Sequence, residues 1–220
     1  MRPVLAAALA TLLALAAASA GRPARSDARA ELRSHLSQAL AFENAARRGG
    51  ANAKAFRSNL TKSQRILNNT RFEIAPVEMV DSEKQMLETL IDEALTYDAR
   101  AAQLRSLDLL GQALASTTAA VQLLDHGAAA GLRTVIGRAV VEERAALPKT
   151  KTRKAHLVNS QTLLGLTIRL LGQSELPVAE AAAASLDQAV QDDKQTVRSN
   201  STVRLREAIA LKQQVLATLP

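Results

Sequence analysis

The stretch from Ser82 to His126 constrains the fold most, because it carries the longest helical pattern in the chain. Its apolar residues recur at intervals of three and four, the spacing of one face of an α-helix. No proline interrupts it, and Gly127 follows as a plausible stop. One unbroken helix of this length would measure about 68 Å at 1.5 Å per residue. We therefore expect its partners to be long helices, or shorter helices stacked along it.

The remainder of the chain is also helical in pattern, so the sequence predicts an all-α fold without a sheet. Three further helical stretches, 26–70, 128–171 and 175–219, are each 44 or 45 residues long, like 82–126. Two architectures fit these lengths: an antiparallel bundle of about four long, kinked or broken helices, or a short stack of hairpins built from six to eight shorter helices. No residue-level repeat is apparent between the four stretches, which favours the bundle.

Each of the four stretches has an interruption near its middle. These lie at Gly49-Gly50, at Ser106, at Pro148 and at Ser199-Asn200.

In the second stretch the apolar residues between 104 and 110 follow two successive steps of three, which turns the apolar face out of line. The helix must overwind, bend, or break at Ser106 and restart, and Gly111 weakens the same region. We expect a waist or hinge at Ser106 and Gly111, with the other interruptions nearby in space.

The first twenty residues have the features of a cleavable secretory signal peptide. Arg2 precedes an apolar run over 4–18, and Ala18-Ser19-Ala20 has the small-residue form of a cleavage site. We expect an exported protein, periplasmic or secreted, with one helical domain over 21–220; an uncleaved membrane anchor is the alternative. The chain has no cysteine, which excludes disulfides and thiolate metal sites.

Glycosylation depends on the source of the chain. Three asparagines begin N-x-Ser/Thr sequences that would carry glycans only in a eukaryote: Asn59, Asn68 and Asn200.

Charge is unevenly distributed along the chain. Residues 21–71 carry eleven basic and three acidic side chains, whereas 72–110 carry three basic and nine acidic ones. If these segments pack side by side, much of the basic excess faces carboxylates of the same molecule.

Two basic clusters are candidates for an anion-facing patch. One follows Pro148 and comprises Lys149, Lys151, Arg153 and Lys154, and the other is the helical series Arg25, Arg29 and Arg33. The alternative is a solvated linker and a polar outer helix face. Nucleic acid is a poor candidate partner, since the chain has only four aromatic residues on which bases could stack.

The sequence contains none of the common catalytic motifs, and we expect neither a cofactor nor a metal. His35, His126 and His156 fall in different helices, without the Glu-x-x-His pairs of di-iron bundles. The adjacent pairs Glu142-Glu143 and Asp192-Asp193 are interpreted as surface charge.

These observations favour an exported, non-enzymatic helical protein that works by binding a protein partner or itself, as an accessory factor or holdase. One alternative is a binder of anionic surfaces, membrane or polyanion, that uses Lys149–Lys154 and the N-terminal arginines. The other is an enzyme or metal protein whose site is assembled from distant residues.

Overall fold

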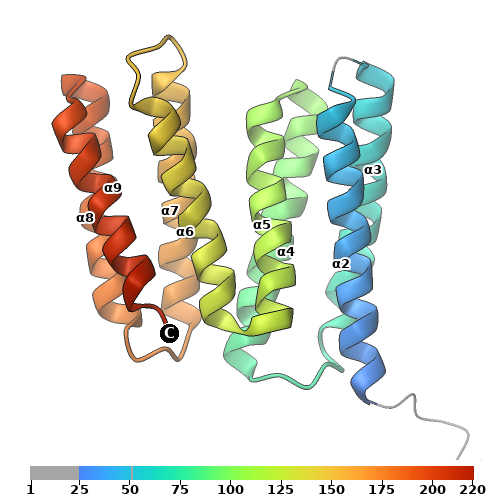
Figure 1. Ribbon diagram of the computed structural model, residues 1–220. Helices are drawn as coiled ribbons and strands as arrows, with labels where there is room; N and C mark the ends of the chain where they lie inside the picture. Colours follow the sequence, from blue (N-terminus) through green and yellow to red (C-terminus); the bar gives the residue numbers. More distant parts are fainter. Residues whose placement is uncertain (1–24, 51) are drawn as a thin grey trace, which may run out of the picture.

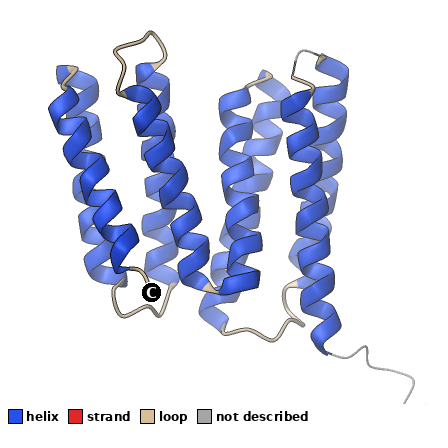
Figure 2. Ribbon diagram, viewed as in Figure 1, coloured by secondary structure: helices blue, strands red, loops and turns tan. Residues whose placement is uncertain are grey.

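The computed structural model describes residues 25–50 and 52–220, which form eight α-helices, a short 3₁₀-helix and no strand. The predicted signal peptide lies outside the described residues. The helices are α2 (Arg25–Arg48), α3 (Ala53–Thr70), α4 (Asp81–Leu104), α5 (Leu107–His126), α6 (Ala128–Ala146), α7 (Arg153–Gln173), α8 (Ala179–Ser199) and α9 (Thr202–Thr218), with the 3₁₀-helix η1 (Arg71–Glu73) after α3. The all-α prediction is therefore confirmed (Figure 2).

Consecutive helices pair as four antiparallel hairpins, α2–α3, α4–α5, α6–α7 and α8–α9 (Figure 1). The hairpins stack side by side, so that α2, α5, α6 and α9 form one layer and α3, α4, α7 and α8 form the other. Each stretch of 44 or 45 residues is one hairpin. The stacked-hairpin architecture is thus correct, and the bundle of four long helices is wrong.

The helix expected over 82–126 is two helices. Arg105 adopts a left-handed conformation, with φ of 51°, and ends α4. Ser106 then caps α5, its side chain accepting a hydrogen bond from the Leu109 N–H. Breaking and restarting at Ser106 was one of the three outcomes that the apolar pattern allowed. The pattern runs through the turn because both helices of a hairpin bury their apolar faces in the same core.

The four interruptions do not form a waist, because they are the turns of the four hairpins and all lie at one end of the molecule (Figure 1). We call this the turn end and define it as residues 47–50, 52–57, 100–108, 144–154 and 198–206. The connections over 74–80, at Gly127 and over 174–178 lie at the opposite end, the loop end. Gly111 lies inside α5, which continues through it. A hinge between 104 and 114 stays a prediction that amide exchange would test.

The two halves of the chain, 25–126 and 128–219, repeat the same burial pattern. In α2 and α6 the buried positions correspond at an interval of 100 residues, for example Leu32 with Leu132 and Ala39 with Ala139. In α3 and α7 the interval is 97, which matches Leu60 with Leu157.

The other two hairpins, α4–α5 and α8–α9, correspond at an interval of 95 residues, turn included. Arg105 and Asn200 both adopt left-handed conformations, with φ of 51° and 53°. Ser106 and Ser201 both cap the following helix with their side chains. The repeat was missed in the sequence because it spans two of the 45-residue stretches rather than one.

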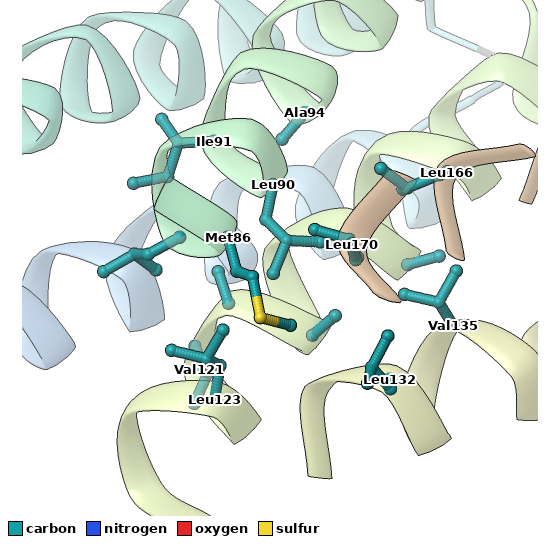
Figure 3. Packing of buried hydrophobic residues seen from close by; sticks show 14 of the residues in the cluster. Met86, Leu90, Ile91, Ala94, Val121, Leu123, Leu132, Val135, Leu166 and Leu170 are labelled. Atoms are coloured by element: carbon teal, nitrogen blue, oxygen red, sulfur yellow. The ribbon is translucent and has the colours of Figure 1, made fainter. Parts of the chain in front are cut away.

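The largest apolar cluster contains residues from all eight helices and joins the two halves. Met86 and Leu90 of α4 lie close to Leu170 of α7 in this cluster, and Leu132 of α6 lines the same region (Figure 3). Toward the turn end each half has a smaller cluster of its own. Phe56 and Leu110 belong to the cluster of the first half, and Leu157 and Leu205 to that of the second.

Candidate functional site

Each half contains a layer of buried polar residues between the large apolar cluster and the small one. Every helix supplies one residue: Glu43, Ser63, Asp98 and Thr117 in the first half, and Glu143, Ser160, Asp193 and Lys212 in the second, at corresponding positions. All eight are fully buried. The prediction of Glu142-Glu143 and Asp192-Asp193 as surface charge is therefore wrong for Glu143 and Asp193, and Glu142 is also buried.

The first polar layer contains two carboxyl groups and no basic residue. Ser63 Oγ and Thr117 Oγ1 donate hydrogen bonds to Glu43 Oε1 at 3.2 and 2.7 Å. Neither carboxylate oxygen of Asp98 has a hydrogen-bond partner among the described residues. Burial raises the pKa of Asp98 to about 7. Burial, together with the nearby Asp98, also raises the pKa of Glu43 well above its usual range. In this layer the negative charge of the carboxyl groups is therefore neutralised by protonation and not by a nearby cation.

The second polar layer has a lysine where the first has Thr117. Lys212 Nζ lies 2.6 Å from Glu143 Oε1 and 3.5 Å from Asp193 Oδ2. Ser160 Oγ donates to Glu143 Oε1 at 2.5 Å. Burial and the nearby Glu143 raise the pKa of Asp193 to about 8, although Lys212 opposes the shift.

These layers are poor candidates for a catalytic or metal site. Their side chains are fully buried, so a dissolved substrate does not reach them in this conformation. In the described part of the chain, no three histidine, aspartate or glutamate side chains come together as a metal site would require. The histidines stay apart: His35 contacts Glu73 at 2.7 Å, His156 contacts Glu142 at 2.8 Å, and His126 ends α5.

Basic residues gather at the turn end, which consists of four segments that lie far apart in the sequence. Its segments carry fourteen basic residues and one acidic residue, whereas the rest of the chain carries fourteen basic and twenty acidic ones. All but one of the fourteen are exposed: Arg47, Arg48, Lys54, Arg57, Arg100, Arg105, Arg144, Lys149, Lys151, Lys154, Arg198, Arg204 and Arg206. The exception is Arg153, which is 6% exposed. The predicted Lys149–Lys154 cluster is thus part of a much larger basic surface.

A pocket of about 210 Å³ opens at the turn end of the second half. Its polar lining comes from Lys149, Thr150, Lys151, Arg153, Lys154, Thr196 and Asn200, and among the residues the structure describes no carboxylate lines it. Four residues of the predicted anion-facing patch therefore line one cavity. Thr196 and Asn200 could not be found by a search for charge runs, because they are neutral and come from the neighbouring hairpin.

The N-terminal arginines do not join this surface. Arg29 donates hydrogen bonds to the carbonyl of Leu124, and Arg33 Nε lies 2.5 Å from Asp125 Oδ1. Both contacts lie at the loop end, where α2 begins and α5 ends. The side chain of Arg25 lies outside the described residues. Arg29 and Arg33 therefore bind groups of the same molecule, at the opposite end from Lys149–Lys154.

The predicted pairing of the basic first segment with the acidic second one includes the ion pair of Arg71 with Asp92, at 2.9 Å. Arg47, Arg48 and Lys54 lie at the turn end, whereas the acidic residues of the first turn of α4, Asp81 and Glu83, lie at the opposite end. Their charge therefore remains open to an outside partner.

Comparison with protein-family profiles, with curated proteins and with solved structures finds no match to this chain. Within the described residues, no helix is both long enough and apolar enough to span a membrane.

The acid pair predicts a fall in stability as the pH rises. The usual pKa of aspartate is 3.8, so unfolded Asp98 ionises well before folded Asp98, whose pKa is about 7. The unfolded state therefore binds fewer protons between pH 4 and 7, and the free energy of unfolding decreases over this range. An Asp98→Asn variant should match the parent at pH 4 and exceed it by a few kcal/mol, in order of magnitude, at pH 8. Urea unfolding measures this; the exposed Asp187→Asn is the control, and an unchanged pH slope in Asp98→Asn would refute the account.

Lys212 is predicted to be essential for the second layer. Lys212→Met leaves Glu143 and Asp193 buried without their cation and should lower the free energy of unfolding by about 3–5 kcal/mol. The exposed Lys194→Met on the neighbouring helix should change it by less than about 0.5 kcal/mol. Equal effects of the two variants in urea unfolding would contradict the role of Lys212.

Proposed function

We propose that this protein is an exported, non-catalytic binding protein that docks on anionic membrane surfaces through its turn end. The observation that carries the proposal is the separation of charge: the turn end is strongly basic, and the remainder of the chain is net acidic. The proposal keeps the expected class, an exported helical binding protein, but takes the anionic surface that was the alternative in place of a protein partner, with the turn end in place of the N-terminal arginines. Export itself is proposed from the signal-like residues 1–20.

Charge separation on this scale favours one orientation at an anionic surface. A bilayer rich in anionic lipids attracts each nearby lysine or arginine by about 1 kcal/mol. The same surface repels the net acidic remainder of the chain. The attraction is therefore directional, and only the turn end meets the lipid headgroups.

Exposed aliphatic residues accompany the basic ones. Leu104, Leu107 and Val203 belong to the turn end and are 62, 54 and 64% exposed. Val141 and Val158, also exposed, lie about one helical turn below it. Basic residues interspersed with aliphatic ones are typical of surfaces that lie at the membrane interface, where the apolar groups enter the headgroup region.

A lipid surface explains this end better than a nucleic acid does. Proteins that bind single strands stack bases on aromatic side chains. Among the described turn-end residues the only aromatic one is Phe56, which is buried, and the exposed Phe72 lies near the loop end. The large apolar side chains that are exposed among the basic residues of the turn end are aliphatic.

Vesicle binding tests the proposal. The protein should bind vesicles that contain phosphatidylglycerol, should not bind vesicles of phosphatidylcholine alone, and should dissociate at about 1 M salt, where the screening length is about 3 Å. Combined replacement of Lys149, Lys151 and Lys154 by glutamine should weaken binding about a hundredfold, at about 1 kcal/mol for each charge.

The matched control replaces Lys62, Arg65 and Lys84 by glutamine, which removes the same charge from outside the turn end. This control should bind nearly as tightly as the parent. Binding to neutral vesicles, or equal losses in the two triple variants, would refute docking through the turn end.

A further inference from the structure

We propose that the pocket beside the first turn of α7 binds a phosphate group, with Arg153 as its central ligand. This deepens the proposed function, and rests on it only in naming a lipid headgroup as one source of the phosphate. A soluble phosphate compound is the other source.

Arg153 is held in place with part of its hydrogen-bonding capacity unused. Its Nη2 donates to the carbonyl of Ser201 at 3.1 Å, which anchors the guanidinium between α7 and the α8–α9 turn. Its Nε and Nη1 are buried and have no hydrogen-bond partner among the described residues. Buried donors without an acceptor are costly, and for a charged group the cost is greater. An anion in the pocket would supply both the acceptors and the missing negative charge.

A second buried donor lines the same pocket. The Thr196 hydroxyl is buried and has no partner among the described residues. Lys149, Lys151 and Lys154 also line this pocket, and all three are exposed. Several cationic side chains, and no carboxylate of the described residues, therefore line one cavity. These cations repel one another, and a bound anion would reduce the repulsion.

The first turn of α7 adds to the attraction. The amino end of a helix carries a partial positive charge and N–H groups that have no partner within the helix. Thr152, which precedes α7, forms no side-chain cap, and the first turn contains no acidic residue. In α3, by contrast, the Asn52 side chain accepts hydrogen bonds from the N–H groups of Lys54 and Ala55.

The internal repeat shows that the two buried donors of this pocket are peculiar to the second half. At the interval of 97 residues Arg153 corresponds to Phe56, and at the interval of 95 Thr196 corresponds to Ala101. Phe56 and Ala101 both belong to the small apolar cluster of the first half. The same two buried positions are thus apolar in one half and carry unpaired donors in the other. Packing alone does not require the donors, because the first half forms without them.

Phosphate suits this set of donors better than a carboxylate does. Its three or four oxygens can accept from Arg153, Thr196 and the lysines together, whereas a carboxylate offers two. The volume of about 210 Å³ holds a phosphate group and the first atoms of an ester.

The test uses the full chain and a variant that borrows a residue from the first half. Arg153→Phe copies the residue at the corresponding position and is expected to fold. Inorganic phosphate and glycerol phosphate are each titrated into the protein in a calorimeter. Both should bind the parent, and Arg153→Phe should weaken this binding at least about tenfold, since two charge-assisted hydrogen bonds are lost. Arg198→Gln, which removes an exposed charge at the same end, should stay within about twofold of the parent. Thermal unfolding without phosphate checks that both variants are folded.

The outcomes separate this inference from the proposed function. If the parent binds phosphate and not vesicles, the pocket is supported and membrane docking is refuted. The pocket is refuted if neither phosphate compound binds the parent, or if both bind Arg153→Phe as tightly as they bind the parent. If the parent binds vesicles in either case, membrane docking stands.

The source of the phosphate follows from a comparison of phosphatidic acid with phosphatidylglycerol at equal vesicle charge. A preference for phosphatidic acid that Arg153→Phe abolishes supports the headgroup. Loss of soluble phosphate binding in Arg153→Phe, with vesicle binding unchanged, supports a soluble phosphate compound in the pocket.

Discussion

The buried polar layers fix the register of three helices in the first half and of all four in the second. Glu43 meets Ser63 and Thr117 only when three helices are aligned at one height, and Lys212 reaches Glu143 and Asp193 only under the same condition. A shift by one helical turn would leave Glu43 without its hydrogen bonds, and Glu143 and Asp193 without their cation, at a cost of several kcal/mol. Purely apolar faces lined with alanine and leucine tolerate such shifts more readily. The layers therefore select one alignment of the hairpins.

That alignment produces the basic surface. Antiparallel helices of similar length place every second reversal at the same end, so four turns far apart in sequence lie at one end of the molecule (Figure 1). The Arg105 side chain donates to the carbonyl of Gly50, and Arg153 to that of Ser201, so the turns contact each other in pairs. Charges that look dispersed along the chain thereby gather on one face.

Sequence patterns predicted the helices and their interruptions, since helical spacing and breaker residues are local signals. They could not distinguish a kink at Ser106 from a reversal, because both keep the apolar spacing on either side. Nor could they place Glu143 or Asp193 in the core, since burial of a carboxyl depends on partners such as Ser160 and Lys212 in other helices. Lys149, Lys151, Arg153 and Lys154 were found as a charge run, whereas Thr196 becomes visible only in the folded chain. A comparison of the chain with itself at intervals of 95–100 residues would have indicated the repeat, and with it the contrast between Phe56 and Arg153.

The central claim is that the turn end, and no other part, contacts an anionic membrane. The chain lacks cysteine, so one engineered cysteine labels one position with an environment-sensitive fluorophore. The account predicts that a label at Leu107 shifts to shorter wavelength when phosphatidylglycerol vesicles are added, because the turn end enters the headgroup region. A label at Phe72, near the loop end and 84% exposed, should not shift. Equal shifts at the two positions, or a shift at Phe72 alone, would contradict the account.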